Sequence, residues 1–398
     1  MSLRIVGNKF FEGATEVRLN AVNDTTAFAN AIAGDNYKNQ NFPNRDIPGM
    51  SILPANSYRE FWWKYFWLCN HLGINAVRLN SGRWEMDLMH SCWYNDRAKF
   101  DSLMTDMLDM AYACGVYVVF CFGGPNQDGS GDPGTFDRNT HGFDKKVNLS
   151  NPMTGSILEP GTEACNHWIA WMGEVMIAYA YHPALGMWDL SNEPDHNTQF
   201  RTFWKIKYPS TWAQAYVDWA NAVTAGVKSI NHTHPVMIGS AGGDMFDWGE
   251  SWYDMRNIGS DCTGVHFYAS VEGPTNEYLV ATRKQWSDNL DRPCFFSEVG
   301  WSQPAYPWEL SYWPWADQMG VKYGVSMAWM ELDNAPTGGI PAYPGYPILQ
   351  SVLDSIPDMP DGVTPPPVTG GGYWLPILVL GGAAVILIFV VATAKPTS

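Results

Sequence analysis

Two glutamates stand where the chain could carry out acid–base and nucleophilic chemistry. Glu193 lies in WDLSNEPD, between an asparagine and a proline, and Glu298 lies in FFSEVGW, just before a turn containing glycine. Each follows a short apolar run that is typical of a β-strand. Two carboxyl groups about 5–5.5 Å apart can cleave a glycosidic bond with retention, one as proton donor and the other as nucleophile. We therefore expect both side chains to reach one cleft.

A closed barrel is the arrangement that would bring these two strand ends together. Apolar, β-rich runs alternate with longer segments of helical spacing, which predicts parallel strands joined by helices. An open doubly wound sheet is the alternative, but no dinucleotide-binding motif or phosphate loop favours it. The predicted fold is an α/β (β/α)₈ TIM barrel, with its chemistry at the carboxyl ends of the strands. Its predicted strands are 17–22, 75–79, 116–122, 185–191, 235–239, 263–268, 294–298 and 325–330, and its predicted helices are 58–72, 97–114, 162–181, 211–230, 275–289 and 312–322.

The motifs on these strands resemble glycoside hydrolase clan A, and family 5 most closely. The resemblance spans residues 14–356 and rests on NEP after the fourth strand and a glutamate ending the seventh. It implies that Glu193 is the catalytic acid/base and that Glu298 is the nucleophile. It also implies that Asn192 binds the sugar 2-hydroxyl and that Arg78, in INAVRLN on the second strand, keeps the nucleophile ionised.

Two further strands carry residues that match substrate-binding positions of the family. His266 and Tyr268 lie in VHFYAS on the sixth strand, and the resemblance implies that the tyrosine hydroxyl contacts the nucleophile. Trp329, in MAWMEL on the eighth strand, matches the tryptophan beneath the sugar at the cleavage point. Asp195 and Glu331, near strand ends, could bind sugar hydroxyls or could simply be solvated. An indole ring offers a flat apolar face, and the candidates for further sugar platforms are Trp84, Trp93, Trp301, Trp308 and Trp313.

The third predicted strand departs from the family pattern. It ends in CFGGPNQDG, where many members carry a histidine, and this favours the mannanase-like branch over typical cellulases. Long loops over 123–161 and 331–347 should emerge at the same face, and the first could bring His141 into the cleft. We therefore expect an endo-β-1,4-mannanase or glucanase that acts by double displacement without a cofactor or metal. The alternative is a membrane-displayed carbohydrate-binding or structural surface protein with a catalytically silent barrel.

Composition limits the range of partners. The formal net charge is −16, and no run rich in lysine and arginine reverses it, so nucleic acid is an improbable partner and a β-linked oligo- or polysaccharide is the expected one. Hydrophobic residues make up 46% of the chain and charged residues 16%, enough apolar material for a large core. The seven cysteines show no spacing typical of a zinc site, and their odd number argues against a complete disulfide framework.

The carboxyl-terminal part of the sequence changes character. The predicted organisation is a barrel domain over 1–357, a Pro/Gly-rich linker over 358–372, a transmembrane helix over 373–394 and a short tail over 395–398. The segment WLPILVLGGAAVILIFVVATA has no charge and is close to the length that crosses a bilayer, so a lipid bilayer is an expected partner. No secretory signal is visible at the amino terminus. The cues for sidedness conflict, and we expect single-pass display of the barrel on a cell or particle surface.

Overall fold

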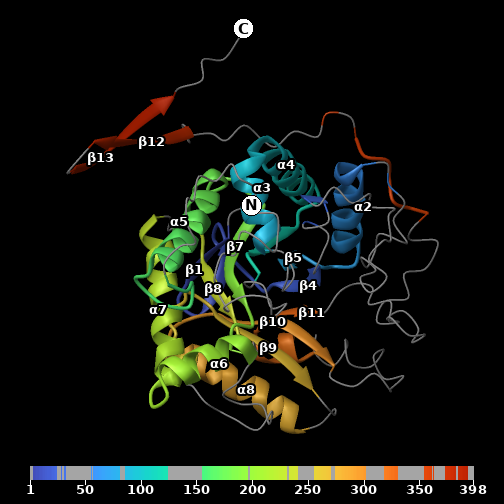
Figure 1. Cartoon of the computed structure of the whole chain (residues 1–398). Coiled ribbons are helices and arrows are strands. Elements are labelled where there is room, and N and C mark those ends of the chain that lie inside the picture. The colour runs from blue at the N-terminus through green and yellow to red at the C-terminus, as the bar shows by residue number, and fades with distance from the viewer. Residues whose placement is uncertain are drawn as a thin grey trace, which may run out of the picture. The chain divides into compact units, whose positions relative to one another are not determined.

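The architecture comes from a computed structural model of the 398-residue chain, drawn in Figure 1. Two units can be separated, residues 1–363 and 364–398, and each is described by itself. The structure describes residues 3–24, 28, 31–32, 55, 57–80, 86–123, 155–195, 198–230, 233–240, 255–269, 274–301, 318–329, 354–360, 362, 373–381 and 384–392.

Eight parallel strands form the centre of the first unit. Their spatial order is β8-β7-β6-β5-β4-β11-β10-β9, which follows the chain apart from the circular offset. Ser240 closes the circle, because it bridges to Val265 of β9 and its carbonyl accepts from the His266 N–H at 2.6 Å. The predicted eight-stranded barrel is confirmed. The strands are β4 Asn20–Asp24, β5 Ala76–Asn80, β6 Tyr117–Cys121, β7 Leu185–Asn192, β8 Val236–Gly239, β9 Thr263–Ala269, β10 Cys294–Trp301 and β11 Ser326–Trp329.

Helices surround these strands (Figure 1). Three of them begin at side-chain caps that satisfy an otherwise unpaired N–H, at Ser57, Asp96 and Thr162. Five predicted helices are confirmed, and 318–323 is helical at the end of the sixth, whose remainder lies outside the described residues. Helices α3 and α6 were not predicted from the sequence. The helices are α2 Tyr58–His71, α3 Met86–Asn95, α4 Arg97–Ala113, α5 Glu163–Ala178, α6 Thr198–Lys207, α7 Trp212–Ile230 and α8 Pro274–Asn289, with a short 3₁₀ turn at Met255–Asn257.

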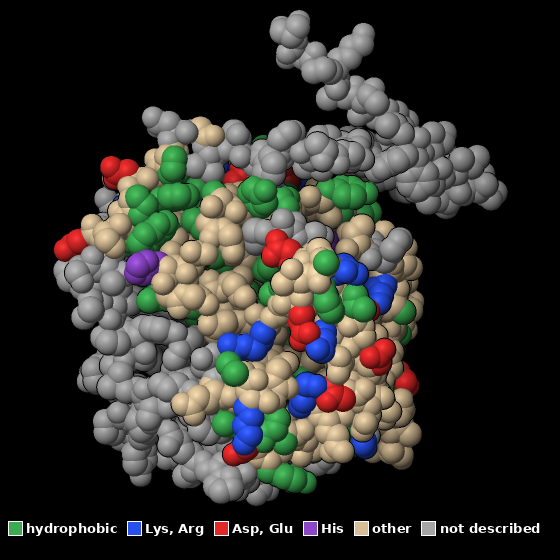
Figure 2. Space-filling view, turned by 180° about the vertical axis from the view of Figure 1, so that it is seen from behind, with side chains coloured by type: hydrophobic (Ala, Val, Ile, Leu, Met, Phe, Trp, Pro, Cys, Tyr) green, Lys and Arg blue, Asp and Glu red, His purple; other side chains and the backbone are tan. Residues whose placement is uncertain are grey.

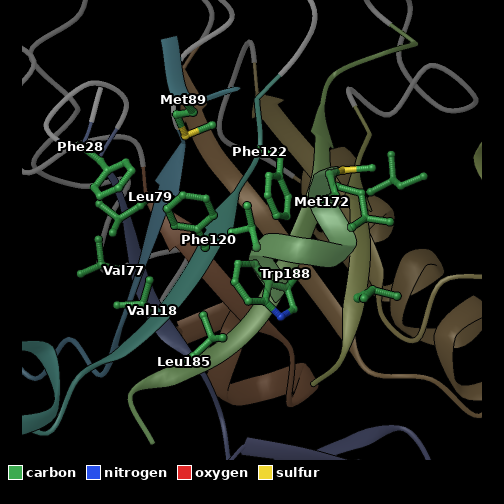
Figure 3. Close-up of a cluster of buried hydrophobic side chains, with 14 of the residues drawn as sticks. Phe28, Val77, Leu79, Met89, Val118, Phe120, Phe122, Met172, Leu185 and Trp188 are labelled. Atoms are coloured by element: carbon green, nitrogen blue, oxygen red, sulfur yellow. The ribbon is translucent and has the colours of Figure 1, made fainter. Parts of the chain in front are cut away.

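The main core lies between the outer face of the barrel and these helices. Alternate residues of each strand point outward, so one strand supplies both this core and the barrel interior. Figure 3 shows Phe120 of β6, and Phe122 just after it, beside Trp188 of β7. The Phe122 and Trp188 rings stack with their centroids 5.4 Å apart, and Phe120 meets Trp188 edge-on at 5.7 Å. Aromatic burial of this kind explains much of the high tryptophan content.

The inside of the barrel forms a second apolar cluster near the amino ends of the strands. It contains Met187, Met237 and Phe295 from three strands, together with Leu3 and Phe10 from outside the barrel. Leu3 and Phe10 belong to a three-stranded antiparallel sheet, β1 Leu3–Val6, β2 Lys9–Glu12 and β3 Thr15–Val17, which the sequence analysis did not predict. This sheet therefore closes the amino end of the barrel with apolar side chains.

Charged side chains are mixed on the face drawn in Figure 2. Lysine and arginine side chains lie among aspartate and glutamate there, and the described residues of this face form no continuous basic patch. This distribution is what the acidic composition leads us to expect. The exclusion of nucleic acid stays a prediction.

The second unit corrects one prediction. Residues 373–394 do not form a helix: two antiparallel strands occupy this segment, β12 Tyr373–Gly381 and β13 Ala384–Ala392, with Gly381 paired to Ala384. Valine and isoleucine favour extended backbone, and Pro376 would remove a hydrogen bond from a helix interior. Among the described residues, no helix is both long and apolar enough to cross a membrane. The predicted transmembrane helix, and the bilayer contact that depended on it, are not supported.

Candidate active site

Glu193 lies directly after the last residue of β7, at the carboxyl end of the barrel. Its N–H donates to the Gly239 carbonyl at 2.7 Å, which ties this point of the chain to β8. Its backbone φ is +46°, a left-handed conformation that costs a residue with a Cβ about 1–2 kcal/mol. Glu193 and Asp291 are the two non-glycine residues with positive φ in the described part of the chain. The hydrogen bond to β8 helps to hold a conformation that glutamate would not choose alone.

Glu298 reaches the barrel interior because β10 contains a bulge. Phe296 pairs with Val265 of β9, and the next pair is Glu298 with His266, so Ser297 is an extra residue. The same irregularity separates Phe296 from Val299 in the pairing with β11. In an unbroken strand with Phe295 inside, Glu298 would face outward, so the bulge reverses its direction.

The two glutamates converge on one histidine. The His266 Nδ1 atom lies 2.8 Å from Glu193 Oε1 and 3.2 Å from Glu298 Oε2. One ligand atom from each of these three residues lies within 4.8 Å of the others. His266 is fully buried, and Glu193 and Glu298 keep 5% and 4% of their surface exposed. The structure therefore brings together the two predicted carboxylates and the predicted histidine.

Arg78 of β5 organises the other side of Glu298. Its Nη1 donates to Glu298 Oε1 at 2.7 Å and to Asn23 Oδ1 at 2.9 Å. Its Nη2 donates to Asn192 Oδ1 at 3.0 Å and, together with Nε, to Asp189 Oδ2 at 2.5 and 2.9 Å. The Arg78 guanidinium thus contacts Asn192 at the end of the fourth barrel strand and Glu298 on the seventh, both of which the sequence analysis selected.

The charged side chains of this cluster are buried, and the cation is paired with carboxylates. Burial by itself lowers the pKa of Arg78, but the carboxylates of Asp189 and Glu298 outweigh it and raise that pKa well above its usual value. Arg78 is therefore a permanent cation. Burial, followed by the charge of Asp189, raises the pKa of the Cys121 thiol well above its usual value, so the thiol near Arg78 stays neutral.

Gly239 of β8 permits this close arrangement. A Cβ atom at this position would lie 2.9 Å from each of three polar atoms: Arg78 Nη2, Asp189 Oδ2 and His266 Nε2. Such distances are too short for any side chain. The Gly239 N–H also donates to Asp189 Oδ1 at 2.9 Å. A glycine is therefore required where the cation, the aspartate and the histidine meet.

Several residues at this end of the barrel were missed by the sequence analysis. Asn23 and Asp189 are fully buried and bind Arg78, and Ser240 donates to Asp195 Oδ2 at 2.9 Å. Asp195 is 2% exposed, so the expectation that it might simply be solvated is wrong. The signal that was available for Asp189 is a polar residue within an otherwise apolar strand, as in WDLSN.

Other predicted positions do not join the cluster in the described structure. Trp93 is 4% exposed, its ring meets Phe100 edge-on at 5.1 Å, and its Nε1 donates to Glu174, so it packs between helices and is not a sugar platform. For Tyr268 and Trp329 the backbone belongs to β9 and β11, but the side chains lie outside the described residues. The side chain of Trp301 and the positions listed next also lie outside them: Trp84, His141, Trp308, Trp313, Glu331 and most of both long loops.

The trio of Glu193, His266 and Glu298 also has the ligand types that a divalent cation prefers. Within the described ranges it is the one group of three such residues that converges so closely. However, the Arg78 guanidinium is already bonded to Glu298 at 2.7 Å. Since a buried fixed cation repels a second one, this arrangement favours proton transfer and nucleophilic attack over metal binding.

The fold and site together define a (β/α)₈ barrel with a carboxylate pair and a guanidinium at the carboxyl ends of its strands. No family model matches the sequence, and no curated protein is similar to it in sequence. Solved structures are similar in fold. An endo-1,4-β-mannanase from Rhizomucor miehei has a TM-score of 0.52 and 11% identity, with 83% of this chain and 90% of that chain covered.

Two further solved structures are also similar in fold. An exo-β-1,4-mannosidase from Opitutaceae bacterium strain TAV5 has a TM-score of 0.53 and 15% identity, covering 88% of this chain and 58% of that chain. A β-glucanase from Saccharophagus degradans in complex with cellotetraose has a TM-score of 0.50 and 15% identity, covering 89% and 94%. The predicted resemblance to clan A barrels is thus confirmed at the level of the fold.

Proposed function

We propose that this protein is a retaining glycoside hydrolase in which Glu298 is the nucleophile and Glu193 is the acid/base. The observation that carries the proposal is the pair of buried carboxylates at the barrel mouth, with oxygen atoms within 4.8 Å of one another. Retaining enzymes hold their two carboxyl groups about 5–5.5 Å apart, whereas inverting enzymes leave about 6.5–9.5 Å for a water molecule. The short separation favours the retaining mechanism.

The assignment of roles follows from the unequal surroundings of the two glutamates. Arg78 donates to Glu298 at 2.7 Å, and we assign the attack on the anomeric carbon to this carboxylate because a fixed cation holds it. The Glu193 carboxylate lies 2.8 Å from His266 Nδ1, and we assign the acid/base role to it. Glu193 would then protonate the leaving oxygen as the covalent glycosyl-enzyme forms, and would take a proton from water as that intermediate is hydrolysed. The proposed role of Asn192, whose Oδ1 accepts from Arg78, is to bond the sugar 2-hydroxyl.

The proposed substrate is a β-linked polysaccharide, of the mannan or glucan type, cut internally. This proposal is supported by the similarity in fold to an endo-1,4-β-mannanase and to a β-glucanase in complex with cellotetraose. The missing histidine at the end of the third barrel strand favours mannan. Products released from mannan, cellulose, xylan and mixed-linkage glucan, separated by chain length, test the sugar and the mode of cleavage; monosaccharide as the sole early product would contradict internal cleavage.

Kinetics of two variants test the proposed roles. Glu298→Gln should lower turnover of every aryl β-glycoside by about 10⁴-fold or more, because no covalent step remains. Glu193→Gln should lower it by about 10²–10⁴-fold for a poor leaving group and much less in the first step for dinitrophenyl, which departs without a proton. Glu16→Gln, on an exposed strand, is the control. Wild-type rates in Glu298→Gln would refute the proposal, and glycan binding without hydrolysis by the unaltered protein would favour a silent carbohydrate-binding barrel.

The location of the barrel stays a proposal from the sequence. Polymeric glycans lie outside cells, so we propose that the barrel is displayed on a cell or particle surface. Protease treatment of intact cells should remove it, and protection of the barrel until lysis would contradict display.

A further inference from the structure

Asp189 of β7 is a carboxylate at this end of the barrel that binds Arg78 and to which the proposed mechanism gives no role. It is fully buried, although burial of a charged group is costly unless the charge is matched. Its position is four residues before Glu193, in WDLSNEP, where neither the spacing nor the resemblance indicated a function. Its contacts are with Arg78 and with backbone N–H groups.

Asp189 holds one edge of the Arg78 guanidinium. Asp189 Oδ2 accepts from Nε at 2.9 Å and from Nη2 at 2.5 Å, and Oδ1 accepts from the Gly239 N–H at 2.9 Å. Both oxygens are therefore held, and the Nε edge of Arg78 is turned towards Asp189. The opposite nitrogen, Nη1, is then directed at Glu298, and Nη2 at Asn192.

We propose that Asp189 is a positioning residue that aims Arg78 at the nucleophile and shares the charge of that arginine with Glu298. This inference rests on the proposed function, since it gives Asp189 a role only if Glu298 attacks the sugar. One buried cation faces two carboxylates, so each carboxylate receives part of its stabilisation. With Asp189 present, Arg78 is not paired with Glu298 alone, so the arginine holds the nucleophile less tightly and leaves it more reactive towards the sugar.

The sign of the expected pH effect follows from the groups that face Glu298. They include Arg78 from β5 and His266 from β9, with Asp189 of β7 and Glu193, which follows β7, one contact further away. Cys121 of β6 is neutral because burial raises its pKa well above its usual value. Removing the negative charge of Asp189 would leave Glu298 as the one described carboxylate paired with Arg78, so the acidic limb of kcat/KM would move to lower pH.

The experiment compares Asp189→Asn with two other variants on an aryl β-glycoside across pH. Asp189→Asn should lower kcat on the order of 10–100-fold, because Arg78 is no longer held from both edges, and should move the acidic limb to lower pH. Asn23→Asp places an added negative charge beside Nη1 of Arg78 and should move that limb to higher pH. Asp109→Asn removes another buried carboxylate, on α4 and paired with His182 at 3.1 Å, and should leave the limb unchanged.

Circular dichroism and thermal unfolding establish that each variant is folded, and Asn23→Asp carries the test if Asp189→Asn does not fold. An unchanged kcat and an unchanged acidic limb in Asp189→Asn would overturn the inference if Glu298→Gln is inactive in the same assay. An active Glu298→Gln would overturn the proposed function as well, so the two failures are distinguishable.

Discussion

The two ends of the barrel interior contain opposite kinds of side chain, although the same strands supply both. At the amino end the space is filled by apolar residues such as Met187 and Phe295, and Leu3 and Phe10 of the added sheet close it. At the carboxyl end, the interior holds Asp189, two residues after Met187, and the bulge-directed Glu298, three residues after Phe295. One end is built for packing and the other for charge.

This difference shows how one scaffold separates stability from chemistry. Apolar burial at the amino end contributes free energy of unfolding in proportion to the surface removed from water. The carboxyl end holds a buried cation, several buried carboxylates and a left-handed glutamate, all of which are unfavourable unless each is matched by a partner. Substitutions at the amino end should therefore change stability, and substitutions at the carboxyl end should change turnover.

The largest effect on stability is expected from Phe10→Ala. Phe10 is 3% exposed and closes the amino end, so its loss should lower the free energy of unfolding by about 3–5 kcal/mol, with kcat of the folded protein unchanged. Denaturant unfolding and aryl glycoside kinetics measure the two quantities. Phe11→Ala, at the partly exposed neighbouring position, is the matched control and should cost much less. A lowered kcat in folded Phe10→Ala would break the separation of the two ends.

Two glycines of adjacent strands give the next comparison. Gly239→Ala should lower kcat on the order of 10²-fold, because the new methyl group would displace Arg78, Asp189 and His266. Gly186→Ala, nearer the amino end, meets Tyr117 Cβ at 3.3 Å and should cost about 1 kcal/mol of stability with turnover retained. Equal kcat values for the two variants would contradict the account.

The left-handed backbone of Glu193 gives a smaller effect. Glu193→Asn and Glu193→Gln both remove the acid, but asparagine tolerates a φ of +46° better than glutamine does. The Asn variant should therefore unfold with a free energy about 1 kcal/mol higher than the Gln variant, as measured by denaturant titration. A more stable Gln variant would show that no strain is stored at this residue.

The smallest effect is a change of stability with pH, caused by His234 near the amino end of β8. Burial, opposed by the hydrogen bond to the Ala180 carbonyl, lowers the pKa of His234 from 6.5 to about 4 in the folded state. As the pH falls, His234 in the unfolded chain therefore binds a proton before His234 in the folded protein does. Its contribution to the free energy of unfolding is fully present above about pH 6.5 and declines as pH falls towards 4. We expect a loss of about 1 kcal/mol between pH 7 and 5.5. His234→Gln should show a smaller decline, and an equal decline would exclude this histidine as the cause.

Sequence patterns predicted the barrel because its strands are apolar on both faces and its helices are long. The paired glutamates were found because they stand at predicted strand ends, and Arg78 and His266 were found because their motifs match the resembled family. The direction of Glu298 was not predictable in the same way, since it depends on a bulge at Ser297 that no residue type specifies. Asp189 was missed because a single polar residue within a strand indicates no partner, and its partner is 111 positions away.

The prediction for the carboxyl-terminal segment was wrong for a different reason. Length and hydropathy alone do not distinguish one apolar helix of about 20 residues from two apolar strands of half that length. The glycines near its centre and the many β-branched residues were the available evidence for the strands β12 and β13. For such a segment, one membrane-spanning helix and a pair of apolar strands both have to be considered.

Covalent trapping tests most directly the central claim that two converging carboxylates cleave a β-glycoside, with Glu298 as the one that attacks. A 2-deoxy-2-fluoro β-glycoside with a good leaving group slows hydrolysis of the glycosyl-enzyme, so the sugar should remain on the protein. Mass spectrometry of the peptides should locate it on Glu298, and the label should be absent in Glu298→Gln. Attachment to another residue, or turnover that gives an inverted product with no label, would contradict the account.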